Sequence, residues 1–120
     1  MSVDFNQRVE EIVKKDPRYQ FDAYEFVMEA LWFTQRKRVR KDHVTGKELL
    51  EGIRELGIEN YGPLAKTVFE HWGVKSTEDF GEIVFNMVEH ALLSKTDTDS
   101  RGDFKNVYDF NKAFDIESIL

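Results

Sequence analysis

The sequence predicts a mainly α-helical protein, folded as a single-domain bundle of about six helices over residues 1–120. Only two prolines and seven glycines interrupt the 120 residues, so long helices can form. Hydrophobic residues make up 41% of the chain and aromatic residues 13%, which supports a buried core rather than disorder. Apolar residues recur at helical spacing, and several stretches begin with helix-capping residues.

The central helix of the bundle is predicted at residues 76–93. Its apolar residues, which include Phe80 and Met87, cover much more than one face. A helix that is apolar around most of its circumference is enclosed by other elements. Ser76 is expected to cap its start, and Gly81 in its interior predicts a close approach by a neighbouring element.

Residues 1–41 are predicted to form two N-terminal helices. The first spans residues 4–15 and ends before Pro17, because proline disfavours helical geometry in the residue that precedes it. The second spans about 22–38, and its middle, residues 23–33, is apolar on several sides. We expect it to lie deep in the fold, with one face available to a partner.

Residues 44–108 are predicted to form the core unit. Thr45 and Glu48 make a capping box that opens a helix, and Gly57 is expected to end that helix. Pro63 suits the first position of the next helix, which Gly73 is expected to end.

The order of two short helices, a tight turn at Gly73 and a longer helix resembles a winged helix-turn-helix domain over about residues 45–108. The resemblance implies a short β-hairpin wing near residues 93–108, and one irregular loop is the alternative. A closing helix at residues 107–119 completes the predicted bundle.

The charge of the chain is uneven. Its net charge is −6, with nine Lys+Arg and seven Asp+Glu in residues 1–41 but eight and sixteen in the remainder. An acidic protein is repelled by nucleic acid unless one face is locally basic. The candidate contact for a polyanion or an acidic partner is therefore the basic run of Arg36, Lys37, Arg38, Arg40 and Lys41. The first reading of this run is still that its cations stabilise a helix C-terminus, and the partner contact is the functional alternative.

The predicted helix 76–93 argues against DNA reading. Recognition helices contact bases through Arg, Lys, Asn or Gln near their start, whereas this helix carries Glu78, Asp79 and Glu82 there. We therefore expect a non-enzymatic protein-interaction module, with an unknown protein or a second copy as partner. The alternative is a nucleic-acid-binding regulator that uses the basic run.

Four aromatic residues bear on the interaction hypothesis. Core packing is the first reading for each of them, because aromatic side chains bury a large area. Exposure of several in one patch would indicate a protein interface. They are Trp32, Phe33, Tyr61 and Trp72.

The sequence shows no recognisable active site, so we predict no catalytic, cofactor-binding or metal-binding residues. The absence of cysteine excludes disulfides, thiolate catalysis and cysteine-ligated metals. The stretch 97–103 begins like a calcium loop, but Arg101 occupies a ligand position. A metal or enzyme site would require His71 and His90 to converge, together with neighbouring carboxylates.

No apolar run is long enough to span a membrane. The N-terminus lacks the basic and apolar regions of a signal peptide. A cytoplasmic location is therefore expected.

Several stretches carry a resemblance to a known family, and together they cover most of the sequence. They are Asp16-Pro17-Arg18-Tyr19, Ala23-Tyr24-Glu25-Phe26-Val27, residues 43–54 from His43-Val44-Thr45-Gly46, and residues 72–104 from Trp72-Gly73-Val74. On these stretches the chain resembles a bacterial family of conserved hypothetical proteins of the planctomycete and verrucomicrobial type. The resemblance implies no activity and no site residues.

Overall fold

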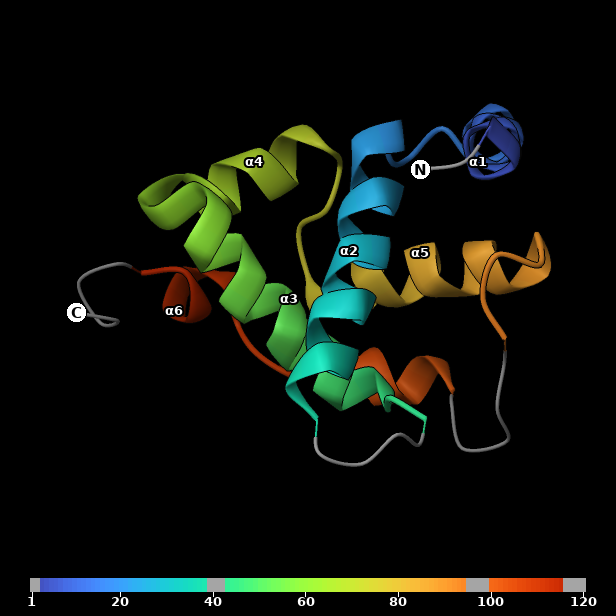
Figure 1. Ribbon diagram of the computed structural model, residues 1–120. Coiled ribbons are helices and arrows are strands. Elements are labelled where there is room, and N and C mark those ends of the chain that lie inside the picture. The colour runs from blue at the N-terminus through green and yellow to red at the C-terminus, as the bar shows by residue number, and fades with distance from the viewer. Residues whose placement is uncertain (1–2, 39–42, 95–99, 116–120) are drawn as a thin grey trace.

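The computed structural model describes residues 3–38, 43–94 and 100–115, and in these ranges every regular element is helical. The prediction of a mainly α-helical bundle is confirmed (Figure 1). The elements in chain order are α1 (Val3–Lys15), α2 (Phe21–Lys37), α3 (Gly46–Tyr61), the 3-10 helix η1 (Gly62–Leu64), α4 (Ala65–His71), α5 (Thr77–Glu89), the 3-10 helix η2 (Arg101–Phe104) and α6 (Phe110–Ala113).

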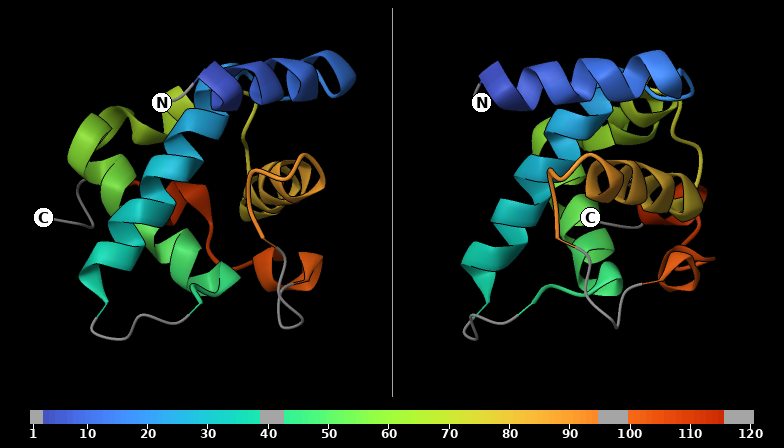
Figure 2. Two further views of the ribbon diagram at one scale, coloured as in Figure 1. Left: turned by 45° about the vertical axis from the view of Figure 1, so that its right-hand side comes forward. Right: turned by 90° about the vertical axis from the view of Figure 1, so that its right-hand side faces the viewer.

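Helix α2 lies at the centre of the bundle and packs against α1, α3 and α5. Helix α1 lies across the start of α2 (Figure 2), and α5 packs against both of them. The predicted deep position of the second helix is therefore correct. Its buried residues are Ala23, Tyr24, Phe26, Val27, Met28, Ala30 and Thr34.

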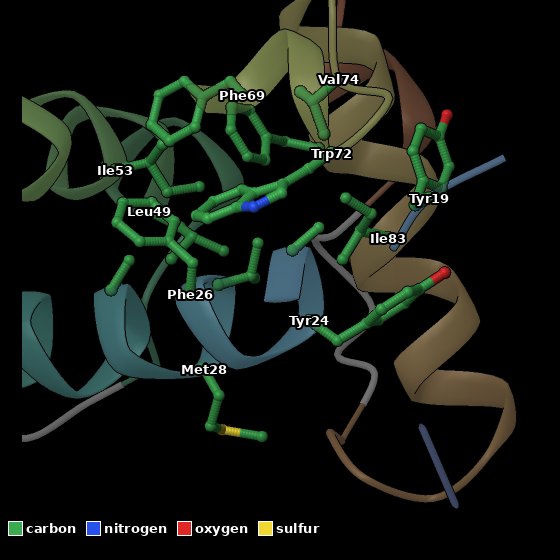
Figure 3. Packing of buried hydrophobic residues seen from close by; sticks show 14 of the residues in the cluster. Tyr19, Tyr24, Phe26, Met28, Leu49, Ile53, Phe69, Trp72, Val74 and Ile83 are labelled. Atoms are coloured by element: carbon green, nitrogen blue, oxygen red, sulfur yellow. The ribbon is translucent and has the colours of Figure 1, made fainter. Parts of the chain in front are cut away.

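A cluster of aromatic rings fills the space between α2 and α4. The ring centroid of Phe26 lies 5.2 Å from that of Phe69 and 5.6 Å from that of Trp72, and the three rings meet in Figure 3. Centroid separations of this size are favourable for tilted and edge-to-face rings. This cluster fixes α4 on the central helix.

Two glycines of α3 allow close packing. A Cβ atom at Gly52 would overlap the Thr34 hydroxyl oxygen of α2. A Cβ atom at Gly57 would lie 2.7 Å from Cζ of Phe69. The prediction that Gly57 ends this helix is wrong, because Gly57 is buried inside α3, which continues to Tyr61. The capping box of Thr45 and Glu48 at the start of α3 is confirmed.

The predicted β-hairpin wing is not formed in residues 93–94 and 100–108, the part of that segment that the structure describes. Residues 101–104 form η2 instead, and the Thr77 hydroxyl holds this segment on α5. It donates to the carbonyl of Phe104 at 2.6 Å and accepts from the amide of Val107 at 3.3 Å. These bonds use backbone groups that a strand ladder would need.

Gly81 explains why η2 sits where it does. A Cβ atom at Gly81 would lie 2.8 Å from Cβ of Phe104, so only glycine lets the Phe104 side chain reach α5. The predicted close approach at Gly81 is confirmed.

The closing helix is shorter than predicted. Helix α6 begins at Phe110, where Asp109 caps it by accepting from the amide of Asn111 at 2.9 Å. Residues 107–109 precede the helix, because the N-cap Asp109 has an extended backbone and the amide of Val107 donates to Thr77. The Tyr108 hydroxyl donates to the Leu50 carbonyl at 2.7 Å. The predicted end at residue 119 lies outside the described residues.

The turn after α4 lies close to the backbone of the connection before α2. Gly73 has a φ of +94°, and the amide of Val74 donates to the Phe69 carbonyl at 2.9 Å, as in a Schellman motif. The amide of Gln20 also donates to the Trp72 carbonyl at 3.1 Å, which joins this turn to the connection before α2. The predicted helix end at Gly73 is confirmed.

We predict that Gly73→Ala lowers the free energy of unfolding by about 2–4 kcal/mol, because the positive φ disfavours a side chain and the new Cβ would overlap the Arg18 carbonyl oxygen. Urea unfolding followed by circular dichroism measures the change. Gly102→Ala is the matched control, since the nearest atom to its Cβ is 3.5 Å away. Equal stability of the two variants would contradict the packing described for Gly73.

Candidate functional site

One surface feature is an apolar groove of about 330 Å³, partly open to solvent. It lies where the second half of α2, the start of α3, the end of α5 and η2 come together (Figures 1 and 2). Its apolar lining consists of Leu31, Val44, Leu49, Val84, Phe85, Val88, Leu92, Leu93 and Phe104. Its other lining residues are Gln35, His43, Thr45, Gly46 and Ser94.

Helix α5 supplies one wall of the groove because it has two apolar faces. Phe80, Ile83 and Met87 face the core and are 0% exposed. Val84 and Val88 lie on a second face, are half-buried and line the groove. The apolar pattern of this helix is therefore broad for two reasons. Some of its apolar residues face the core, and others line the groove.

A strained turn at Ala91 directs the chain after α5 into the groove. Ala91 has a φ of 60°, in the left-handed region that favours glycine. The amide of Leu92 donates to the Met87 carbonyl at 2.8 Å, and that of Ala91 donates to the Val88 carbonyl at 3.1 Å. This is a Schellman motif with alanine in the position where glycine is usual. It brings Leu92 and Leu93 to the lining.

Two aromatic rings also line the groove. The rings of Phe85 and Phe104 meet edge to face, with centroids 6.2 Å apart. The guanidinium carbon of Arg101 lies 5.0 Å from the centroid of the Phe85 ring, and an Arg101 nitrogen lies 3.7 Å from a carboxylate oxygen of Glu82. These contacts fix Phe85 in place at the edge of the groove.

The predicted basic run is divided by the structure. The Lys37 ammonium pairs with Glu55 of α3 at 2.9 Å and lies 4.7 Å from the centre of the Phe33 ring. Arg38 donates to the His43 carbonyl at 2.8 Å, and a nitrogen of Arg38 lies 3.5 Å from a carboxylate oxygen of Glu48. Lys37 therefore joins α2 to the second half of α3, and Arg38 joins it to the start of α3.

The other cations of the run differ from these two. Arg36 is exposed and has no ion pair with any described residue. Arg40 and Lys41 lie outside the described residues. The candidate contact for an acidic partner therefore keeps Arg36 as its exposed member without an ion pair, in the part of the run that the structure covers.

One of the four aromatic residues singled out in the sequence is exposed. Trp32 is 44% exposed, whereas Trp72 is buried at 7%, and Phe33 and Tyr61 are half-buried. Trp32 precedes the groove-lining Gln35 by three positions on α2, so the two are neighbours on the helix surface. A large aromatic side chain therefore stands next to the groove.

The acidic residues at the start of α5 mostly serve structural roles. Asp79 accepts hydrogen bonds from the Tyr19 hydroxyl and from the amide of Lys75, the latter at 2.8 Å. The predicted capping by Ser76 is wrong, because its side chain makes no capping bond; Asp79 binds the chain just before the helix instead. Glu82 lies 3.7 Å from nitrogens of both Arg18 and Arg101, while Glu78 is exposed.

A polar cluster joins the α1–α2 connection to α5. Two nitrogens of Arg18 donate to the Asp16 carboxylate at 2.8 and 2.7 Å, and the Asn86 amide donates to the same carboxylate at 3.0 Å. The hydrogen bonds from Arg18 hold the pKa of Asp16 well below its usual range, against the opposing effect of burial. Asp16 therefore stays ionised and anchors the connection.

The same cluster contains two tyrosines. Burial, followed by the hydrogen bond to Asp79, raises the pKa of Tyr19, and burial raises the pKa of Tyr24. Both hydroxyls therefore stay protonated at neutral pH. Perturbed pKa values can mark a catalytic site, but here each shift follows from a contact that holds the fold together.

The histidines singled out in the sequence lie at helix ends. His71 ends α4, and its carbonyl accepts from the Gln20 side chain at 3.1 Å. His90 follows α5. Its Nδ1 lies 3.0 Å from the Asn86 carbonyl oxygen, and the carbonyl of His90 accepts a hydrogen bond from Arg8. Among the described residues, no group of three or more His, Asp or Glu is placed to hold a metal ion.

Comparison of the chain with protein-family models, curated proteins and solved structures finds no match. The resemblance to a bacterial family of conserved hypothetical proteins therefore stays a prediction. No helix in the described ranges combines the length and the apolar character needed to cross a membrane.

We predict that Ala91→Gly raises the free energy of unfolding by about 0.5–1 kcal/mol, because glycine removes the left-handed strain at a modest cost in unfolded-chain entropy. Thermal and urea unfolding measure the change. Asn106→Gly is the control, since Asn106 also has a positive φ of 49° but asparagine tolerates that region. A destabilised Ala91→Gly variant would contradict the assigned turn.

We predict that Asp16→Asn lowers the free energy of unfolding at pH 7 by about 1 kcal/mol, after allowance for solvent screening of the half-exposed Arg18. The folded-state pKa of Asp16 lies below the unfolded-state value of about 3.9. Its contribution is therefore present above that value and is lost as the pH falls through and below it.

The measurement is urea unfolding of both proteins at a series of pH values. The difference between them should shrink below about pH 4. Asp4→Asn is the control, because the Asp4–Arg8 ion pair is exposed on the surface of α1. A difference that stays constant with pH would contradict the role of the Asp16 charge.

Proposed function

We propose that this protein is a non-enzymatic protein-interaction module that binds an amphipathic helical segment of another protein in the groove between α2, α3 and α5. The observation that supports this most strongly is the half-buried apolar side of α5, whose Val84 and Val88 line the groove at the margin of the core. Apolar surface left open beside an exposed Trp32 is typical of an interface.

The chemistry of the lining favours an apolar segment over a small polar ligand. A small-molecule site needs several polar groups that converge on the ligand. Here the Thr45 hydroxyl accepts from the amide of Glu48 at 3.2 Å, and the His43 carbonyl accepts from Arg38. Apolar side chains at helical spacing can fill a groove of this kind, as in helix-in-groove recognition.

The charges beside the groove indicate how the segment is oriented. The exposed cations Arg36 and Lys47 follow lining residues on the α2 and α3 side, whereas the exposed Glu89 follows Val88 on the α5 side. We infer that the bound segment carries acidic residues along the edge that faces α2 and α3. Such complementarity sets the orientation of a partner and speeds its association.

The alternative is a nucleic-acid-binding regulator on a helix-turn-helix-like scaffold made by α3, α4 and α5. Less of the described surface supports it. Lys37 and Arg38 are paired with carboxylates of α3, and the start of α5 presents the exposed Glu78. Nucleic acid binding through the basic run would weaken steeply with added salt.

We predict that Val88→Glu weakens the binding of groove-directed peptides at least about tenfold, because it places a carboxylate in apolar surroundings. The probes are peptides of about 16 residues selected on the folded protein from a displayed library, about four to five helical turns long. Isothermal titration calorimetry measures their affinity, and amide chemical shifts locate their contacts.

Leu64→Glu is the matched control, because Leu64 is an equally apolar side chain on η1 that is 60% exposed and does not line the groove. It should leave peptide affinity within about twofold, as expected for a surface change away from the contact. Circular dichroism confirms that both variants are folded. Peptides that bind both variants equally, or whose contacts lie away from the groove, would overturn the proposal.

A further inference from the structure

A second surface of α2 is distinct from the groove. Asp22, Glu29, Trp32 and Arg36 are exposed, while Glu25 and Phe33 are partly exposed. At about 100° per residue, these six positions fall within an arc of about 100° on the helix. We call this the outer face of α2. The groove-lining Leu31 and Gln35 fall outside it.

The outer face is ordered by charge along the helix. Its first turns carry the carboxylates of Asp22, Glu25 and Glu29, its middle carries the rings of Trp32 and Phe33, and its end carries Arg36. None of these four charged residues has an ion pair in the part of the chain that the structure describes. Like charges three or four residues apart on a helix repel one another.

Two observations identify the charged and aromatic groups near the outer face. Burial, followed by the nearby carboxylates of Glu29 and Asp22, raises the pKa of Tyr61, so both carboxylates lie near that ring at the end of α3. Lys37 is next to this face, but its ammonium group pairs with Glu55 and lies over the Phe33 ring. The carboxylates of the face therefore have no cation of their own chain beside them among the described residues.

We propose that the outer face of α2 binds the same face of a second copy of the chain, with the two α2 helices antiparallel. Centred between Trp32 and Phe33, this arrangement places Glu29 of each copy opposite Arg36 of the other. Within one copy, Glu29 and Arg36 are seven residues and about 10 Å apart along the helix, so they cannot pair with each other.

The chemistry of the face favours this occupant over an unrelated partner. A twofold interface must be self-complementary, and a face that is acidic at one end and basic at the other meets that condition only when the helices run in opposite directions. A parallel pair would place like charges together. The exposed Trp32 supplies the central aromatic anchor that such interfaces require.

This inference does not rest on the proposed groove, because none of the residues that line the groove belongs to the outer face. Trp32 and Arg36 lie beside the groove but do not line it, and Glu29 is not part of the groove proposal. Loss of peptide binding in a groove variant leaves the association of two copies intact, and loss of association leaves the groove intact. The two proposals therefore fail separately.

The test is the molecular mass in solution, by sedimentation equilibrium over about 1–500 µM, a range suited to weak association. The unaltered chain should form a dimer. Glu29→Arg should place guanidinium groups of the two copies against each other, and Arg36→Glu should place carboxylates of the two copies against each other. Each variant alone should dimerise at least about tenfold more weakly.

An equimolar mixture of the two single variants supplies the decisive result. At positions 29 and 36, the Glu29→Arg copy carries two cations and the Arg36→Glu copy carries two carboxylates. Each contact between position 29 of one copy and position 36 of the other then joins opposite charges, so a heterodimer should form. The controls Glu59→Arg and Lys105→Glu make the same kinds of charge reversal at exposed positions outside the face and should dimerise like the unaltered chain.

Three results would overturn the proposal. They are a monomeric unaltered chain across the whole concentration range, single variants that dimerise as well as the controls, and a mixture that does not associate. Circular dichroism verifies the fold of each variant. Because Glu29 and Arg36 are both exposed, neither substitution removes a core contact.

Discussion

Phe69 contacts aromatic rings from other helical elements of the bundle, and the position of each depends on it. It is 0% exposed, and its ring lies 5.2 Å from Phe26 of α2, 5.3 Å from Phe80 of α5 and 5.3 Å from Phe114 at the end of α6. Gly57 of α3 leaves room for the same ring. This one side chain thus sets how α2, α3, α5 and α6 meet, and the groove lies where its cluster does not extend.

The groove exists because the far end of the bundle is packed differently. Near Phe69, rings fill the space between helices, whereas most of the apolar side chains that line the groove are aliphatic and shorter, with the rings of Phe85 and Phe104 beside them. The Ala91 turn then carries Leu92 and Leu93 along the open edge. A left-handed alanine is costly, and such strain is often retained where it shapes a functional surface.

Local patterns in the sequence predicted most of the helices but not the tertiary contacts between them. The capping box at Thr45 and the end of α4 at Gly73 depend on neighbours a few residues away, and both are confirmed. The helix end predicted at Gly57 was wrong because the reason for that glycine is the ring of Phe69, twelve residues on. The predicted wing was wrong because Thr77 binds the backbone of residues 104 and 107. The groove was not predicted, since only packing separates the two apolar faces of α5.

The two proposed surfaces meet at Trp32, and their arrangement has a consequence for binding. Trp32 lies on the outer face and neighbours Gln35 at the groove, and two antiparallel copies of α2 would join two grooves in one twofold-symmetric dimer. A partner with two binding segments, or a partner that is itself a dimer, would then engage both grooves at a raised effective concentration. Individually weak groove contacts would suffice for stable recognition under that geometry, which fits a groove of modest volume in a small chain.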